Sequence, residues 1–230
     1  MAAQDPTTAP RRAARGPRER GPDPRTLRTR AVVAEAATTL FLRNGYQATS
    51  VDDIAELASV SKRSIYNNFT DKESLFTELV LGFTETAESF AGQITGELTE
   101  AADPQQALYE LGRRQLRTVA VSQVLRLRRL IIIEAARFPG LAEEYYRCAP
   151  GRVIAALSLA FAELHRRGDL TAPDPDRAAQ HFSYLVLGHI LDTFLFDPDG
   201  GLPPPAHLDQ IADDGVRAFL AAYGPHSGRP

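Results

Sequence analysis

The chain has 230 residues, a single cysteine and a formal net charge of −3 at pH 7. One cysteine excludes an intramolecular disulfide, and a chain of this length builds a core that needs neither a disulfide nor a structural metal. No apolar run is long enough to span a membrane and the N-terminus lacks the apolar core of a signal peptide, so the sequence predicts a cytoplasmic protein without a membrane partner.

Charge is divided unevenly along the chain. Residues 1–72 carry 12 Lys and Arg against 8 Asp and Glu, a net charge of +4, whereas residues 73–230 carry 14 against 21, a net charge of −7. A basic first part on an acidic remainder favours contact between that first part and a polyanion such as DNA. A solvated charge asymmetry without any partner is the alternative.

Residues 1–25 are rich in Pro, Gly and Arg and have almost no large apolar side chains, so they are predicted to form a disordered arm. The arm either reaches phosphates or the minor groove of DNA, or is a solvated tail with no role. Its arginines are Arg11, Arg12, Arg15, Arg18, Arg20 and Arg25.

Short helices are predicted directly after the arm. A first helix over residues 27–43 has an apolar stripe and ends at Asn44-Gly45, a pair that favours the left-handed conformation at a helix C-terminus. Polar residues that cap free backbone N–H groups precede each of the next three helices. The predicted N-caps are Ser50, Ser61 and Thr70, the last with Glu73 as its capping-box partner.

Residues 50–69 have the spacing of a helix-turn-helix. A helix over residues 51–58 is followed by a turn at Ser59-Val60 and a second helix over residues 62–69, and Ala55 is small enough for the two helices to touch. The outward side chains of the second helix then enter the major groove of DNA. They are Lys62, Arg63, Ser64, Tyr66, Asn67 and Asn68.

The rest of the chain is predicted to be helical as well. Apolar side chains at three- or four-residue spacing predict one long helix that begins after Thr70 and continues to Leu98. Further helices are expected over residues 104–120, 122–137, 141–148, 151–167, 174–196 and 206–223.

The residues around the helix-turn-helix resemble the TetR family of transcriptional regulators in order and spacing. The matching residues are Gly45, Thr49, Ser50, Ile54, Ala55, Ala58, Val60, Ser61, Tyr66, Phe69, Lys72, Glu73 and Leu75. The resemblance implies an all-α fold with an N-terminal three-helix helix-turn-helix DNA-binding domain over residues 26–72. A larger helical ligand-binding and dimerisation domain would follow over residues 73–225, and residues 130–170 look like the C-terminal domain of the AefR-like subgroup.

The resemblance further implies that the second helix of the motif reads bases and that Thr49, Tyr66 and Lys72 bind phosphates. Helix initiation is the alternative role for Thr49, and core packing is the alternative for Tyr66. The candidate DNA-binding residues are Thr49, Ser61, Lys62, Arg63, Ser64, Tyr66, Asn67 and Lys72.

Two positions depart from the family's usual pattern. Ser59 stands where the family often has Gly in the turn, which requires a positive φ at a residue other than glycine. Arg63 stands where the family often has Gly or Pro, and a guanidinium group can bond the edge of a guanine through two hydrogen bonds. Arg63 is therefore expected to add base recognition.

The resemblance also implies a ligand cavity in the larger domain, lined by aromatic and apolar side chains with an Arg or His as a polar anchor. Plain core packing is the alternative for each candidate. The candidates are Phe83, Phe90, Tyr109, Leu116, Arg128, Tyr145, Tyr146, His181 and Phe182.

The helix predicted over residues 174–196 is apolar on nearly every face, so it needs cover on all sides. A homodimer through the last two helices would supply that cover as a four-helix bundle about a two-fold axis. The predicted interface residues are Leu185, Ile190, Phe194, Leu208, Ile211, Gly215 and Phe219.

The patterns and the resemblance together indicate a TetR-type DNA-binding regulator, and the resemblance implies a repressor that a small-molecule effector releases from a palindromic double-stranded operator. No cofactor motif, metal cluster or catalytic constellation is visible; His181, His189 and Asp192 share one helix, but the two histidines lie two turns apart. An all-helical enzyme or small-molecule carrier that uses the same cavity is the rival class, and an activator remains open beside a repressor.

Overall fold

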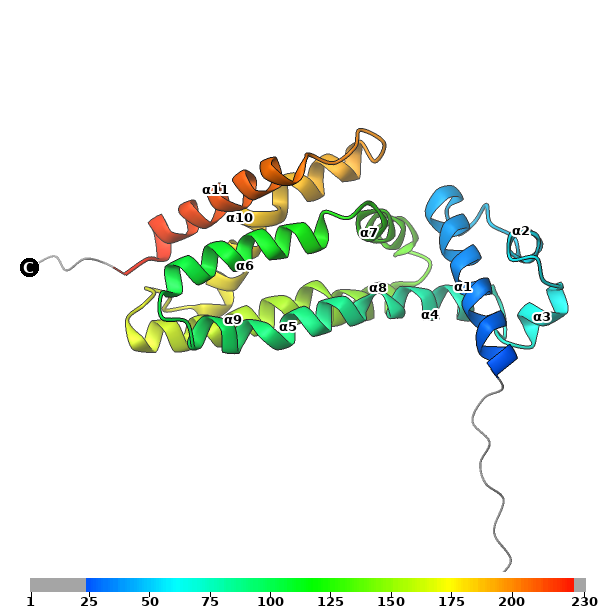
Figure 1. Ribbon diagram of the computed structural model, residues 1–230, viewed down its shortest axis with the longest axis horizontal. Coiled ribbons are helices and arrows are strands. Elements are labelled where there is room, and N and C mark those ends of the chain that lie inside the picture. The colour runs from blue at the N-terminus through cyan, green and yellow to red at the C-terminus, as the bar shows by residue number, and fades with distance from the viewer. Residues whose placement is uncertain (1–23, 226–230) are drawn as a thin grey trace, which may run out of the picture.

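The computed structural model describes residues 24–225, and these residues form eleven α-helices and no strand (Figure 1). The head consists of α1 (Pro24–Asn44), α2 (Val51–Leu57) and α3 (Lys62–Tyr66), and α4 (Lys72–Gly82) leads out of it. The predicted all-α fold is confirmed. The arm predicted over residues 1–25 lies outside the described residues except for Pro24 and Arg25, which begin α1.

Seven helices form the larger body. They are α5 (Thr84–Thr99), α6 (Pro104–Val119), α7 (Ser122–Glu134), α8 (Pro139–Cys148), α9 (Pro150–Arg167), α10 (Pro175–Phe196) and α11 (Pro205–Tyr223). In Figure 1, α4 and α5 follow one another along one edge of the molecule, from the head to the far end, and α11 lies along the opposite edge. None of the helices between residues 24 and 225 combines the length and apolarity that a membrane crossing requires.

Local sequence signals place the starts of α2 and α3 at the predicted residues. Gly45 directly follows α1 and has a positive φ of 84°. Ser50 caps α2 in a capping box with Asp53. Ser59 takes the positive φ that the turn requires, at 53°. The second helix of the motif is shorter than predicted, because α3 ends at Tyr66 and not at residue 69.

The start of α4 differs from the prediction by one residue. Asp71, not Thr70, is the N-cap: its carboxylate accepts a hydrogen bond from the backbone N–H of Ser74 at 2.7 Å, and the Ser74 hydroxyl accepts one from the backbone N–H of Asp71 at 3.1 Å. Glu73 is therefore not the reciprocal partner. A carboxylate also stabilises the positive end of the helix dipole, which a threonine hydroxyl does not.

The single helix predicted from Thr70 to Leu98 is in fact two helices, α4 and α5, interrupted at Phe83. Gly82 has low helix propensity, and the Thr84 hydroxyl donates to the carbonyl oxygen of Leu81 at 2.7 Å, in competition with the helical backbone bond. Phe83 keeps a right-handed helical conformation, with φ −73° and ψ −14°. The apolar spacing therefore continues through the interruption and does not reveal it.

Two hydrophobic clusters organise the described residues. One fills the body between α5, α6, α9, α10 and α11, with Phe161, Phe182 and Phe219 at its centre. The other fills the head, but it also includes Leu130 of α7 and Tyr145 of α8. The head is therefore packed directly against one end of the body.

Candidate nucleic-acid interface and interior cavity

Two serines hold the start of α3, the helix whose exposed side is the candidate DNA-contacting surface. The Ser61 hydroxyl accepts a hydrogen bond from the backbone N–H of Ser64 at 3.1 Å, and the hydroxyl oxygens of Ser61 and Ser64 lie 2.9 Å apart. Ile65 is buried against the head core. Burying one side of α3 directs Lys62, Arg63 and Tyr66 to solvent.

The two basic side chains of α3 differ in their pairing. The ammonium group of Lys62 forms an ion pair with Asp52 of α2 at 2.9 Å, and this hydrogen bond raises the pKa of Lys62. Within residues 24–225, no carboxylate lies at ion-pair distance from Arg63. Arg63 is therefore available to a base or a phosphate without first losing an internal partner, whereas Lys62 must leave Asp52.

Some of the polar residues after Arg63 form contacts within the head, and others are exposed. Asn67 is exposed and forms the C-cap of α3, and Tyr66 is 49% exposed. The Asn68 amide nitrogen donates to the carbonyl oxygen of Ser64 at 2.8 Å. Tyr66 is thus on the surface and not in the core, which removes the alternative reading of this residue.

Thr49 does not lie on the surface where a phosphate could meet it. Its side chain is 1% exposed, and its hydroxyl donates to the carbonyl oxygen of Gly45 at 2.8 Å. This contact holds the turn between α1 and α2. The expected phosphate contact through the Thr49 hydroxyl is therefore not presented in this structure.

Lys72 is likewise directed inward. Its ammonium group donates to the carbonyl oxygens of Tyr46 at 2.9 Å and Thr49 at 2.8 Å, and lies 4.2 Å from the centre of the Tyr46 ring. Burial, followed by the nearby charge of Arg137, lowers the pKa of Lys72. The predicted phosphate ligand instead joins α4 to the turn that precedes α2.

An aromatic joint, which the sequence analysis missed, connects the head to the body. Phe138, in the turn between α7 and α8, lies 5.0 Å from Tyr46 and 5.6 Å from Phe76 between ring centres. The guanidinium of Arg137 lies 5.4 Å from the Tyr46 ring. Only the Phe-Pro-Gly stop after α7 marks this turn in the sequence, and that signal predicts where a helix ends but not what the turn contacts.

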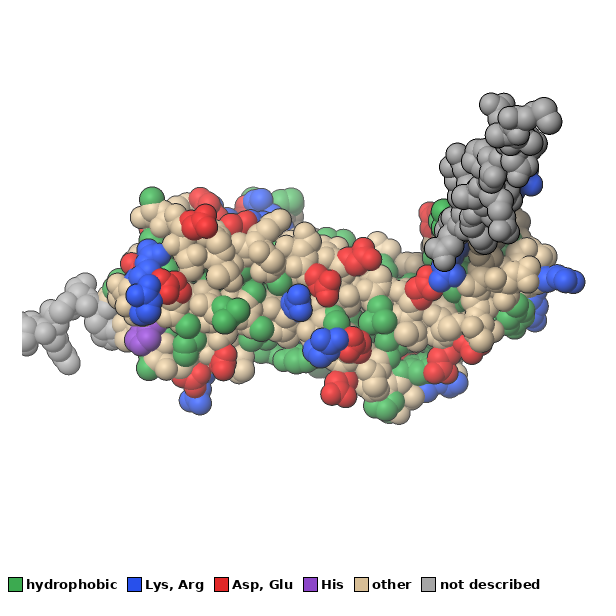
Figure 2. Space-filling model, turned by 90° about the horizontal axis from the view of Figure 1, so that it is seen from below, with side chains coloured by type: hydrophobic (Ala, Val, Ile, Leu, Met, Phe, Trp, Pro, Cys, Tyr) green, Lys and Arg blue, Asp and Glu red, His purple; other side chains and the backbone are tan. Residues whose placement is uncertain are grey.

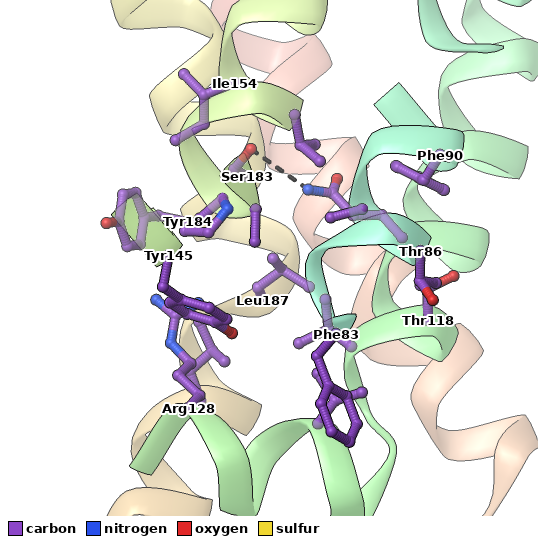
Figure 3. A pocket seen from close by; sticks show the side chains of 18 residues that line it. Phe83, Thr86, Phe90, Thr118, Arg128, Tyr145, Ile154, Ser183, Tyr184 and Leu187 are labelled. Atoms are coloured by element: carbon purple, nitrogen blue, oxygen red, sulfur yellow. Dashed lines mark hydrogen bonds between the residues drawn. The ribbon is translucent and has the colours of Figure 1, made fainter. Parts of the chain in front are cut away.

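The body contains a partly open cavity of about 110 Å³. Helices α5, α6, α7, α8, α9 and α10 all contribute to its wall, so it lies between the helix that leads to the head and the penultimate helix. Most of the lining is apolar. Figure 3 shows Tyr145 beside Arg128 on one side and Ser183 on another, with Leu187 between them.

Four of the nine predicted ligand-site residues line this cavity, namely Phe83, Phe90, Arg128 and Tyr145. The other five lie elsewhere. Leu116 and Phe182 are fully buried in the body core, and Tyr109 packs on its edge. Tyr146 is exposed, and His181 is exposed with its ring nitrogen 2.7 Å from the Tyr223 hydroxyl. Leu116, Tyr146 and Phe182 are each adjacent in sequence to a residue that lines the cavity, and adjacent residues of a helix point in different directions.

Sequence reasoning found Arg128 but missed the amide and the small hydroxyl side chains of the cavity. Gln115 of α6 is 4% exposed, its amide nitrogen lies 3.4 Å from the Ser183 hydroxyl of α10, and its amide oxygen has no hydrogen-bond partner (Figure 3). Both residues line the cavity, as do Thr86 and Thr118. Gln115 lies in an amphipathic helix that carries three arginines, so the sequence does not show that its amide is buried or that it faces a cavity.

The predicted dimer-interface residues are mostly buried within their own chain. Ile190, Phe194, Leu208, Gly215 and Phe219 are core residues, because α10 packs against α6, α9 and α11 of the same chain. Ile190 and Phe194 of α10 are therefore covered by their own chain and do not need a second copy for their burial.

Two predicted interface residues keep some exposure. Leu185 is 44% exposed and Ile211 is partly exposed. A stripe along α10 remains uncovered in the single chain, and we call it the α10 stripe. It consists of Leu185, His189, Asp192 and Phe196, of which Phe196 is 89% exposed.

Charges on the body face of Figure 2 are interspersed in sign, and Lys and Arg side chains also lie at the outer edge of the head.

Among the residues that the structure describes, no group of three or more His, Cys, Asp or Glu side chains is arranged to hold a metal ion.

Two family models match this chain. The model described as "Bacterial regulatory proteins, tetR family" matches residues 33–79, and the model described as "AefR-like transcriptional repressor, C-terminal domain" matches residues 106–225. The first match spans most of α1 through most of α4, and the second runs from α6 to the end of α11.

Solved structures and curated relatives agree with these matches. A TetR-family transcriptional regulator from Mesorhizobium loti is 35% identical with a TM-score of 0.76, over 88% of this chain and 100% of that one. The flavonoid-responsive regulator FrrA is 30% identical with a TM-score of 0.66, over 87% and 99%. The regulator ArpR of Pseudomonas putida is 32% identical over 181 residues, 74% of this chain and 82% of the relative. Two other curated bacterial regulators are matched over only 25% and 28% of their own length.

Proposed function

Because this chain belongs to the TetR family of transcriptional regulators, we propose that it is a homodimeric repressor released from a palindromic operator by a small molecule. The observation that carries this proposal is the capped α3, which presents Arg63 and Tyr66 to solvent at the outer end of the molecule. A helix of this width fits the major groove of DNA. The proposed role is non-catalytic.

The proposed operator contact uses the exposed side of α3. Arg63 would bond a base edge, Tyr66 would donate its hydroxyl to a phosphate, and Lys62 would exchange Asp52 for a phosphate. Ser61 and Ser64 support the contact by holding the start of α3, and exposed Asn67 is a further candidate. Thr49 and Lys72 would act indirectly, by fixing the backbone around α2.

The proposed dimer uses the α10 stripe rather than the core residues of α10. Residues 185, 189, 192 and 196 are spaced by three or four and share one side of the helix. An exposed phenylalanine and leucine in line favour burial against a second copy. A two-fold dimer would place two copies of α3 about one DNA turn apart on a palindrome.

The proposed effector site is the cavity between α5, α6, α7, α8, α9 and α10. Two of its walls lead to the head: α5 continues from α4, and α7 ends at the turn that carries Phe138 against Tyr46. A ligand that moves either wall would shift the head. Since coupling between two sites is reciprocal, operator DNA would weaken ligand binding by the same factor.

The repressor proposal is tested by binding of the full-length protein to the DNA upstream of its gene, measured by fluorescence anisotropy at several salt concentrations. Arg63→Ala is expected to weaken specific binding by about tenfold to a hundredfold, as expected for loss of an arginine contact to a base. The matched control is Arg152→Ala on the exposed side of α9, which removes the same charge from the body. Equal loss in both variants, or equal affinity for every DNA sequence, contradicts sequence-specific reading by α3.

A further inference from the structure

We infer that the cavity binds a small aromatic carboxylic acid that carries a hydroxyl group, with the carboxylate at Arg128 and the hydroxyl at Gln115 and Ser183. This inference rests on the proposed effector site and names the chemistry of its ligand. It is carried by three properties of the cavity wall: an unpaired cation, an unpaired buried amide, and the absence of acidic side chains.

The cation is Arg128 of α7. Within residues 24–225, no carboxylate lies at ion-pair distance from its guanidinium group. Of the described residues, eighteen line the cavity and none is Asp or Glu. A positive charge beside an apolar space favours an anionic ligand group, and a guanidinium binds a carboxylate through two parallel hydrogen bonds. A cationic ligand would find no counter-charge there and would lose its hydration.

The unpaired amide is that of Gln115. The side chain is buried, and its amide oxygen has no hydrogen-bond partner while its amide nitrogen meets the Ser183 hydroxyl at 3.4 Å. A buried polar atom without a partner is costly, so a ligand that satisfies it gains affinity. A hydroxyl group suits this position, because it donates to the amide oxygen and also accepts from the Ser183 hydroxyl.

The size and lining of the cavity favour a single aromatic ring between these two polar ends. Its volume of about 110 Å³ is of the same order as an apolar cavity of about 150 Å³ that holds one benzene molecule. Phe83, Phe90 and Tyr145 supply aromatic walls. Figure 3 places Arg128 and Ser183 apart, with Leu187 between them, which leaves the apolar part of the lining for the ring.

The experiment is isothermal titration calorimetry of full-length protein without DNA, with 4-hydroxybenzoate and 4-hydroxycinnamate as probes. Each probe is compared with the acid that lacks the hydroxyl, with its methyl ester and with the amine tyramine. At least one hydroxylated acid is expected to bind. Its methyl ester is expected to bind about tenfold or more weakly, because the hydrogen bond to a charged group is lost. Tyramine is expected to show no measurable binding.

Variants assign the two ends of the ligand. Arg128→Met is expected to weaken binding of the acid by about tenfold or more, whereas Arg128→Lys retains part of it. The matched control is Arg129→Met, which removes the same charge one residue along α7 from a side chain that does not line the cavity. Gln115→Leu is expected to bring the hydroxylated acid to the affinity of the acid without the hydroxyl.

Absence of binding by both hydroxylated acids, or binding of the ester or tyramine as tight as that of the acid, overturns the inference. Sequence-specific operator binding by the same protein would leave the proposed function standing in that case. Conversely, an acid that binds at Arg128 and Gln115 but does not change operator affinity supports the inference and contradicts ligand-controlled repression.

Discussion

The hydroxyl groups of Thr49 and Tyr66 lie in opposite environments, although the family pattern assigns both of them to phosphates. The Thr49 hydroxyl is buried and donates to the Gly45 carbonyl, whereas the Tyr66 ring is half exposed on α3. Lys72 is also directed inward like Thr49, because its ammonium group donates hydrogen bonds to two backbone carbonyl oxygens. At the scale of single residues, the head therefore separates side chains that shape the motif from side chains that face DNA.

Substitutions at these two positions are expected to have opposite effects. Thr49→Val keeps the shape of the side chain but removes one buried hydrogen bond, so the free energy of unfolding should fall by about 1 kcal/mol, with operator affinity of the folded protein unchanged. Tyr66→Phe should leave stability unchanged and weaken operator binding severalfold. Urea denaturation measures the free energy of unfolding and anisotropy titration measures operator affinity. If Thr49→Val lost operator affinity without losing stability, a direct contact between Thr49 and a phosphate would be supported instead.

The contact between α10 and α11 depends on a glycine. A Cβ atom built at Gly215 would lie 2.5 Å from the carbonyl oxygen of Leu185, which is backbone and cannot turn aside. The two helices approach at this point more closely than any larger residue allows. The same approach buries Val186 and Val216 and leaves the α10 stripe as the uncovered side of α10.

Gly215→Ala is therefore expected to lower the free energy of unfolding by about 1–3 kcal/mol, since an added methyl group forces the helix backbones apart. The matched control is Gly92→Ala in α5, where a Cβ would meet nothing within 4 Å. That control should stabilise the protein by up to about 1 kcal/mol, because alanine has the higher helix propensity. Thermal and urea denaturation compare the two, and equal effects would argue against close packing at Gly215.

In the whole molecule, the head and the body share a hydrophobic cluster. Leu130 and Tyr145 of the body pack with head residues, and Phe138 contacts Tyr46 and Phe76. Tyr145 also lines the cavity, so one side chain contributes to both the ligand site and the cluster that supports the head. The α10 stripe lies on a different helix, where a second copy can cover it without disturbing this joint.

Disruption of the α10 stripe is expected to yield folded monomers. Leu185→Arg places a charge within the α10 stripe, so sedimentation at micromolar concentration should show a shift from dimer to monomer, and operator binding should weaken with loss of the second half-site. Leu159→Arg is the matched control, because Leu159 is an exposed leucine on α9, outside the proposed interface. A dimer that persists in Leu185→Arg contradicts the proposed interface.

The sequence by itself determined the all-helical fold, the caps of α2 and α3 and the helix-turn-helix. Ser50, Ser61 and Gly45 act on backbone groups within a few residues, so their effects can be read locally. Even here Thr70 was wrong as a cap and the interruption at Phe83 was invisible, because several neighbouring polar side chains can bond the same stretch of backbone.

Only the tertiary structure decided which side chains face DNA, the cavity or a second copy. Gln115 and Ser183 are 68 positions apart in sequence, and Lys72 meets Tyr46 from 26 positions away. Ile190 and Phe194 of α10, predicted for the dimer, proved to be covered by helices of the same chain, whereas Leu185 stays exposed. Such contacts depend on how helices far apart in the sequence pack together, and a helical pattern specifies that a face is buried but not what buries it.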